Sequence, residues 1–173
     1  GSKYFGVNST VAGDRDGSGA TGIDAIAIGA NANATGNYSI AQGYGANATQ
    51  NYSIAQGYQA NALGDGIAIG NQANASHVNT VAVGSFAKAS GSASAFGFNS
   101  SATGCVSLAI GYWASATGDY SSAIGRAAFA SGRNSLAVGD AAGALGNFSL
   151  AVGAAANATG NYSIAQGAWA NAT

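Results

Sequence analysis

Few residues in this 173-residue sequence are able to do chemistry. There is one His and one Cys, His77 and Cys105, and the acidic residues are six Asp without any Glu. A Cys–His pair suits nucleophilic catalysis only if the two side chains lie within hydrogen-bond reach. These two residues are 28 positions apart, which the repeat described below converts into two coils, or about 10 Å along the axis. The dispersed Asp residues offer no paired carboxylates. We therefore expect no catalytic residues and no enzyme.

A metal or cofactor site is equally unsupported. The run Asp14-Arg15-Asp16-Gly17 is similar to the start of a calcium loop, but the further acidic ligands and the closing Glu are missing. We predict a solvated turn there, with neither metal nor cofactor. Eleven Asn-x-Ser/Thr triplets have the form of glycosylation acceptors. Most of them follow from the repeat itself, which places Asn two positions before Ser or Thr.

The composition excludes several classes of protein. Charged residues make up 6% of the chain, against about 25% in a typical soluble domain. Five scattered Lys and Arg form no patch for nucleic acid, and one Cys forms no disulfide scaffold. No apolar run approaches about twenty residues, so we predict no spanning helix. Ala and Gly account for 70 residues and Ile, Leu and Val for only 23, which predicts a thin core.

The backbone that must position any functional residue is set by an internal repeat. The tripeptide Ala-x-Gly recurs eleven times, with spacings of 13 or 14 residues between its glycines, which serve below as reference positions. The second position before the reference glycine is always Ala, as is the fifth position after it. The reference glycines are Gly29, Gly43, Gly57, Gly70, Gly84, Gly97, Gly111, Gly125, Gly139, Gly153 and Gly167.

Each repeat unit divides into two strand-like segments and two three-residue corners that Gly usually opens. Glycine permits the sharp backbone that such corners require. Fourteen residues with two strands and two corners predict one coil of a flattened, all-β parallel β-solenoid. Helices are excluded, because Gly at intervals of seven would weaken them throughout. We predict an entry segment with an irregular first coil over residues 1–22 and a repeat array of eleven coils over residues 23–173.

Alternation along the strands assigns side chains to faces. We expect the large residues at offsets −3 and −1, such as Ile67 and Ile69, to face the interior opposite the alanines at +3 and +5. The alanines at −2 would then point outward. An apolar stripe of this length is unusual on a monomer, so we predict that it packs against other copies of the chain. The predicted packing residues are Ala27, Ala41, Ala55, Ala68, Ala82, Ala95, Ala109, Ala123, Ala137, Ala151 and Ala165.

Large side chains also occur in the first corner of several coils, where no core requires them. Exposed aromatic residues together with Arg are typical of binding hot spots. We therefore regard these residues as candidate ligand contacts, the alternative being that they stack between coils or cover a subunit seam. They are Tyr44, Tyr58, Phe86, Phe98, Tyr112, Trp113, Arg126 and Trp169.

The repeat resembles a known family. The run from Ser149 to Gly153, its relatives Ser107 to Gly111 and Ser135 to Gly139, and the half-unit x-Ala-x-Ala-Thr-Gly are similar to the YadA-like head repeats of trimeric autotransporter adhesins. The opening Lys3-Tyr4-Phe5-Gly6-Val7-Asn8-Ser9 resembles the segment that introduces them. The resemblance implies a left-handed parallel β-roll, a homotrimer, and display at the bacterial cell surface outside the outer membrane.

The same resemblance implies a function without chemistry. We expect an adhesive head that attaches to host cells or to extracellular-matrix protein through many weak contacts. We also expect the chain to be a head fragment, with its membrane attachment supplied by a C-terminal anchor outside this sequence. One alternative is a passive spacer or an autoagglutination surface. Another is an ice-binding solenoid, because Thr recurs at offset +6; that column comprises Thr35, Thr49, Thr103, Thr117, Thr159 and Thr173.

Overall fold

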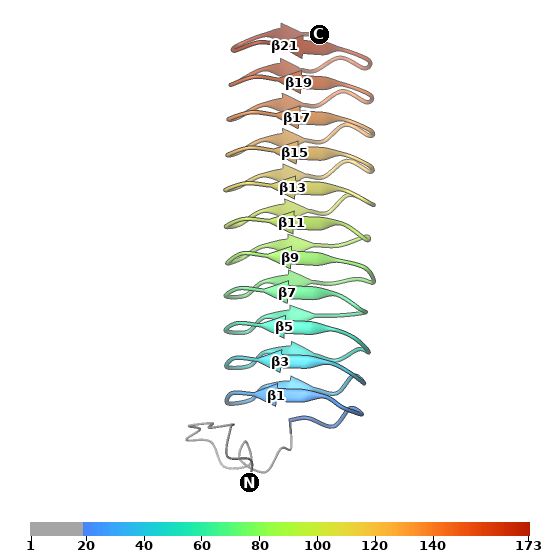
Figure 1. Ribbon diagram of the computed structural model, residues 1–173. Coiled ribbons are helices and arrows are strands. Elements are labelled where there is room, and N and C mark those ends of the chain that lie inside the picture. The colour runs from blue at the N-terminus through green and yellow to red at the C-terminus, as the bar shows by residue number, and fades with distance from the viewer. Residues whose placement is uncertain (1–18) are drawn as a thin grey trace.

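The computed structural model describes residues 19–173 and shows a column of stacked coils (Figure 1). Two eleven-stranded sheets of parallel strands run along the column, and each coil adds one strand to each sheet. The first sheet contains β1 (Ile26–Ile28), β3 (Ile40–Gln42), β5 (Ile54–Gln56), β7 (Ile67–Ile69), β9 (Val81–Val83), β11 (Ser94–Phe96), β13 (Leu108–Ile110), β15 (Ser122–Ile124), β17 (Leu136–Val138), β19 (Leu150–Val152) and β21 (Ile164–Gln166). The second contains β2 (Asn33–Ala34), β4 (Asn47–Ala48), β6 (Asn61–Ala62), β8 (Asn74–Ala75), β10 (Lys88–Ala89), β12 (Ser101–Ala102), β14 (Ser115–Ala116), β16 (Phe129–Ala130), β18 (Gly143–Ala144), β20 (Asn157–Ala158) and β22 (Asn171–Ala172).

Strand register follows the sequence repeat. Ala27 pairs with Ala41 across β1 and β3, one full repeat later, and Asn33 pairs with Asn47 across β2 and β4. The two shortened units keep this register, because each loses its residue in a corner and not in a strand; Ala55 still pairs with Ala68, although they are 13 residues apart. The predicted all-β parallel solenoid of 14-residue coils is confirmed. Its left-handedness stays a prediction of the resemblance.

Corner geometry explains why glycine recurs. The first-corner glycine Gly111 has φ +133°, outside the range that other residues adopt readily, and a Cβ there would lie 2.4 Å from the carbonyl oxygen of Gly125 in the next coil. The third residue of most corners is left-handed without being Gly, as in Trp113 and Tyr120, with φ of 60° and 57°. Such a conformation costs roughly 1–2 kcal/mol per residue, so inter-coil packing must offset it.

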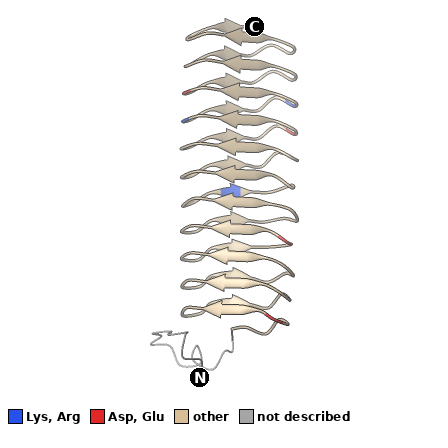
Figure 2. Ribbon diagram, viewed as in Figure 1, with Lys and Arg blue, Asp and Glu red and all other residues tan. Residues whose placement is uncertain are grey.

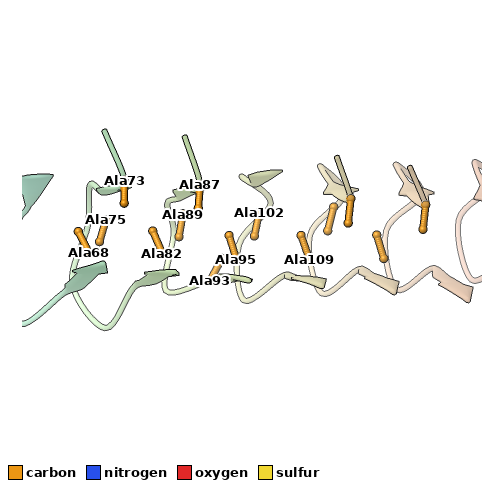
Figure 3. Close-up of a cluster of buried hydrophobic side chains, with 14 of the residues drawn as sticks. Ala68, Ala73, Ala75, Ala82, Ala87, Ala89, Ala93, Ala95, Ala102 and Ala109 are labelled. Atoms are coloured by element: carbon orange, nitrogen blue, oxygen red, sulfur yellow. The ribbon is translucent and has the colours of Figure 1, made fainter. Parts of the chain in front are cut away.

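The interior of the column is made of methyl groups. Alanines at offset −2 in the first sheet point toward alanines at +3 and +5 from the opposite side (Figure 3). Ala68 and Ala82 of the first sheet and Ala75 and Ala89 of the second are 0–2% exposed. The prediction of a thin core, with +3 and +5 facing inward, agrees with this arrangement.

The facing predicted for the first sheet is wrong. Ten of the eleven −2 alanines, Ala41, Ala55 and Ala109 among them, are buried inside their own chain at 0–2% exposure, and only Ala27 in the first coil is half-buried. A side chain enclosed between two sheets of one chain is not available to a partner subunit. The physical reason is width, since two sheets held apart by methyl groups leave no room for Ile or Leu between them.

The large residues at −3 and −1 therefore point outward. Ile40, Ile54 and Leu108 at −3 are half-buried by their neighbours in the sheet, and Ile69 and Ile110 at −1 are 36% and 38% exposed. We call the outward side of the first sheet, formed by offsets −3 and −1 from β1 to β21, the aliphatic face. It is mostly apolar, and it is the outward surface that the sequence had led us to assign to the alanines.

The outward side of the second sheet is polar. Asn33 Nδ2 donates to Asn47 Oδ1 at 3.0 Å, and the same bond repeats from Asn47 to Asn61 and from Asn61 to Asn74 at 2.9 and 3.0 Å. This amide ladder ends at Asn74, because the next strand of the sheet has Lys88 at the same position. Lys88 is the only charged residue within the strands that the structure describes. A continuous chain of side-chain hydrogen bonds reinforces the stacking of these coils.

The first 18 residues lie outside the described part of the chain. Most of the predicted entry segment 1–22, the opening run Lys3 to Ser9 and the Asp14–Gly17 turn fall there. At the start of the described part, the Ala34 amide donates to the Gly19 carbonyl at 2.7 Å, and Ala20 forms a bridge with Ala34. Residues 19–173 contain no helix of the length and apolar character needed to cross a bilayer.

Candidate adhesive site

The first corner turns the chain from the first sheet into the second, and its side chains at offsets +1 and +2 project away from both. Offset +3 returns to the interior, as in Ala114, which is fully buried. Tyr112 and Trp113 at +1 and +2 of the same corner are 54% and 53% exposed. The corner therefore presents large side chains to solvent on a rigid support.

Four of the predicted contact residues gather at this corner in three consecutive coils. Phe98 stacks on Tyr112 with ring centroids 5.2 Å apart, and Phe86 meets Phe98 edge to face at 5.8 Å. Trp113 lies tilted beside Tyr112 at 6.3 Å. Phe86, Phe98, Tyr112 and Trp113 form what we call the aromatic patch. Rings at these separations gain about 0.5–1.5 kcal/mol per pair beyond their buried area, which holds the patch in shape before any ligand arrives.

A smaller pair occupies the same corner nearer the N-terminus. Tyr44 stacks on Tyr58 with ring centroids 5.5 Å apart and 48–50% exposure. Beside them Gln72 Nε2 donates to Gln59 Oε1 at 3.3 Å. Two amides and two phenols thus offer both apolar surface and hydrogen-bonding groups in adjacent coils.

The remaining two predicted residues differ from each other. Arg126 lies one coil beyond Tyr112, where its guanidinium donates to Asp140 at 2.7 Å. Both side chains are about half exposed or more, so the ion pair adds roughly 0–1 kcal/mol to stability. Arg126 lies at the edge of the aromatic patch, and Asp140 balances its charge. Trp169 is 81% exposed, stands in the last coil and lies three coils beyond Arg126. The structure does not bring Trp169 to the patch.

Aromatic side chains also lie at the second corner, at offset −5, and they are not among the predicted contact residues. Tyr38 stacks on Tyr52 at 5.4 Å, Phe148 stacks on Tyr162 at 5.2 Å, and Arg133 lies 5.9 Å over the Tyr120 ring. All five rings are 48–75% exposed. Their recurrence at one offset was the available signal, because no interior position of a methyl-filled coil accepts a ring.

The residues able to do chemistry stay apart. His77 follows β8 and Cys105 follows β12, with β10 lying between those strands in the sheet. His77 Nδ1 is 3.1 Å from the Ser76 hydroxyl, and the Cys105 amide donates to Asp119 Oδ1 at 2.9 Å. Both side chains are exposed, and within residues 19–173 no pocket encloses either one.

Charge contributes little to recognition on this surface. Charged residues are sparse along the coils and fall mostly at the corners (Figure 2). In the described part of the chain they number three Lys or Arg and four Asp, with no group of three or more potential metal ligands. Long-range electrostatic steering needs a strong field of one sign, which these few charges do not provide.

These features define a class of protein, a repetitive parallel β-solenoid with an apolar face and exposed aromatic corners. Comparison with known families places it more closely. The YadA head domain repeat matches residues 20–46, 34–60, 48–66, 64–87, 107–128, 130–156 and 158–173. These matches cover most of the chain, which therefore belongs to the YadA-like heads of trimeric autotransporter adhesins, a family of adhesins and not of enzymes. No curated protein matches the sequence.

The matches omit one stretch of the described coils, residues 88–106. This stretch holds the second shortened unit, the strand β11 with Ser94 and Phe96, and Ser100 where the other coils have Ala. The coil is nevertheless built like its neighbours, since Ala95 pairs with Ala82 and Ala109 on either side. The departure is one of sequence and not of architecture.

Proposed function

We propose that this chain is a non-enzymatic adhesive head that assembles as a homotrimer at the bacterial surface and attaches to extracellular-matrix protein or a host receptor. The observation that carries the proposal is the division of the surface into two kinds. One is a mostly aliphatic face without charge, and the other consists of exposed aromatic corners.

The aliphatic face supports the assembly. It presents Ile, Val and Leu in most coils, and none of its residues in β1 to β21 is charged. Burial of apolar area is the main favourable term in association, at roughly 25 cal/mol per Å² of surface removed from water. The family membership supports three copies, because these heads belong to trimeric adhesins. We therefore assign the interface to the aliphatic face and not to the buried alanines.

The corners support adhesion. In a trimer the aromatic patch occurs three times, so weak contacts at each copy combine through effective concentration into a much stronger attachment. Aromatic rings provide large rigid contact area at little cost in side-chain entropy, which suits a surface with so few charges. A host protein with exposed apolar and hydrogen-bonding groups is the expected ligand class.

The experiment is a binding panel on the purified chain. Light scattering first establishes its mass, for which we expect three copies. Immobilised collagens, fibronectin and laminin and cultured cells are then probed with the intact protein and with a Leu136→Asp variant, which places a charge on the aliphatic face. A Ser115→Asp variant, on the outward side of the second sheet, is the matched control. We expect Leu136→Asp alone to lose both the trimer and the avidity-dependent binding.

Two results would contradict the proposal. A folded monomer would contradict the proposed assembly. A trimer that binds none of the matrix proteins or cells would contradict the proposed adhesive role. A passive spacer or autoagglutination surface predicts binding to other copies of the head alone. An ice-binding surface predicts thermal hysteresis, which a freezing-point measurement on the same sample detects.

A further inference from the structure

The near-identity of the coils creates a problem for any assembly through the aliphatic face. Adjacent strands of the first sheet are about 4.8 Å apart, and most of them present the same kind of aliphatic pair. Val81 and Val83 of β9, for example, are closely matched in size by Leu136 and Val138 of β17. Copies that slid by one coil would therefore regain most of their apolar contacts. Something must fix the axial register.

The aliphatic face carries two blocks in which neighbouring positions both depart from Ile, Val and Leu; single departures also occur at Ser122 and Gln166. In the first, Gln42 and Gln56 occupy offset −1 in neighbouring strands, and Gln56 Nε2 donates to Gln42 Oε1 at 3.1 Å. Ile28 precedes this block and Ile69 follows it in the same column. The amide pair is thus a two-coil polar interruption with an aliphatic residue at each end.

The second block differs in size and not in polarity. Strand β11 presents Ser94 at −3 and Phe96 at −1, one of the smallest outward residues beside the largest. Its neighbours in the −1 column are Val83 and Ile110. Phe96 is 38% exposed, the same fraction as Ile110, and its ring is larger than either aliphatic neighbour.

We propose that these two blocks, Gln42 with Gln56 and Ser94 with Phe96, set the register in which the copies of the chain associate. The inference rests on the homotrimer and aliphatic interface of the proposed function, and adds how that interface aligns. In the matched register identical coils lie at the same height around the symmetry axis, so each Gln amide meets amides and each Phe96 meets the space left by Ser94.

A slip of one coil breaks both matches. Gln56 of one copy would face Ile69 of the next, and Gln42 of the next copy would face Ile28. Each mismatch removes an amide from water without supplying a partner, which lowers the equilibrium constant about tenfold or more. Phe96 would meet Val83 or Ile110 with no small residue beside it, which overfills the contact. A single polar residue fixes register in coiled coils by the same principle.

The test uses two differently tagged full-length chains, both with Cys105→Ser, expressed together. One carries Val138→Cys and the other Val152→Cys, which are neighbours one coil apart in the −1 column. A second pair, Leu136→Cys with Leu150→Cys, samples the −3 column. After oxidation, disulfides between equal positions report matched copies, and disulfides between different positions report a slip of one coil.

We expect equal-position products to exceed unequal-position products at least about tenfold in the otherwise native chain. The register variant combines Gln42→Ile, Gln56→Ile, Ser94→Val and Phe96→Val, all residues that other coils already carry at these offsets. In it we expect unequal-position products to rise to a comparable amount. The matched control, Ile67→Val with Ile69→Val, alters the same face without touching either block and should leave the ratio unchanged.

Each other outcome overturns the proposal. Unequal products in the native chain, no equal-position product in either column, or an unchanged ratio in the register variant would each show that the blocks do not set register. Mass measured on the same samples separates this from failure of the proposed function. A trimer with an unchanged ratio contradicts only the register, whereas a folded monomer contradicts the assembly itself.

Discussion

Phe98 and Tyr112 lie one coil apart with their ring centroids 5.2 Å from each other and their planes only 13° from parallel. The separation is close to the spacing of the coils themselves, so the stack follows directly from the backbone. Two aromatic residues at offset +1 of consecutive units are held in this relation whether or not a ligand is present. Such preorganised contact area reduces the ordering cost of binding.

The first prediction concerns this pair. Replacing Phe98 and Tyr112 by Ala removes the centre of the aromatic patch, while the buried alanines of their coils stay in place. We expect attachment to the responsive matrix protein or cell to fall by tenfold or more, at about 2 kcal/mol for a hot-spot side chain, with the melting temperature nearly unchanged.

Phe148→Ala with Tyr162→Ala is the matched control, because it removes a stacked pair from the second corner, at 5.2 Å. Surface plasmon resonance with trimer mass checked on each variant provides the measurement. Equal losses from both pairs would show that the patch has no special role. A loss of trimer from the first pair would instead assign Phe98 and Tyr112 to a subunit seam.

The second prediction tests which residues lie inside the coil. Ala123 at offset −2 is fully buried within its own chain, whereas Ala154 at offset +1 is exposed. Ala123→Leu forces three extra carbon atoms between two sheets held apart by methyl groups, at a cost of about 1–3 kcal/mol or more. Ala154→Leu should change stability by less than about 0.5 kcal/mol.

Thermal and urea unfolding followed by circular dichroism measures both variants. The opposite arrangement, with Ala123 at a subunit interface, makes a different prediction. In that arrangement Ala123→Leu would release folded monomers without lowering the stability of each chain.

The sequence was sufficient to predict the architecture. It was not sufficient to predict in which direction the side chains of the first sheet point. Recurrent glycines and alternation fix two strands and two corners per coil, because glycine opens every first corner and most second corners. Alternation alone leaves two choices of which side faces inward, and the first sheet was assigned by placing its largest residues in the core. A better criterion for which side faces inward is how little a position varies from one unit to the next. Offset −2 is Ala in every unit, like +5, whereas −1 varies from Val138 to Phe96 and Gln42.

The candidate contact residues were easier to find than their arrangement. An aromatic residue at a corner has no interior to enter, so its exposure follows from the repeat. Which rings meet depends on their offset and on whether neighbouring coils also carry one. Trp113 joins the patch through Tyr112, while Trp169 has Ala155 as its counterpart in the preceding coil. The second-corner rings follow the same logic and were recognisable at offset −5.

The third prediction concerns the first-corner glycines. Gly111 has φ +133° and faces the next coil's backbone, and Gly45 has φ +62° with only the Gln59 side chain near, at 3.4 Å. Gly111→Ala therefore combines an inaccessible conformation with a steric collision, and we expect it to destabilise the chain by more than about 3 kcal/mol. Gly45→Ala should cost only about 1 kcal/mol, because other residues occupy its conformation elsewhere in the column. Urea unfolding of the two variants compares them directly, and equal costs would contradict this assignment.

The fourth prediction arises from a column of serines at offset −4 whose hydroxyls are buried. Ser39 Oγ donates to the Gly36 carbonyl at 2.6 Å, whereas the buried Ser121 hydroxyl has no hydrogen-bond partner. Removing a bonded hydroxyl leaves a buried acceptor unpaired, so Ser39→Ala should destabilise the chain by about 1 kcal/mol. Ser121→Ala removes an unpaired group and should be neutral or stabilising. Both side chains are fully buried, so each variant is the other's control for lost volume. If Ser121→Ala loses as much stability in urea as Ser39→Ala, the Ser121 hydroxyl has a partner in solution. The distinction between bonded and unbonded serines at offset −4 would then be wrong.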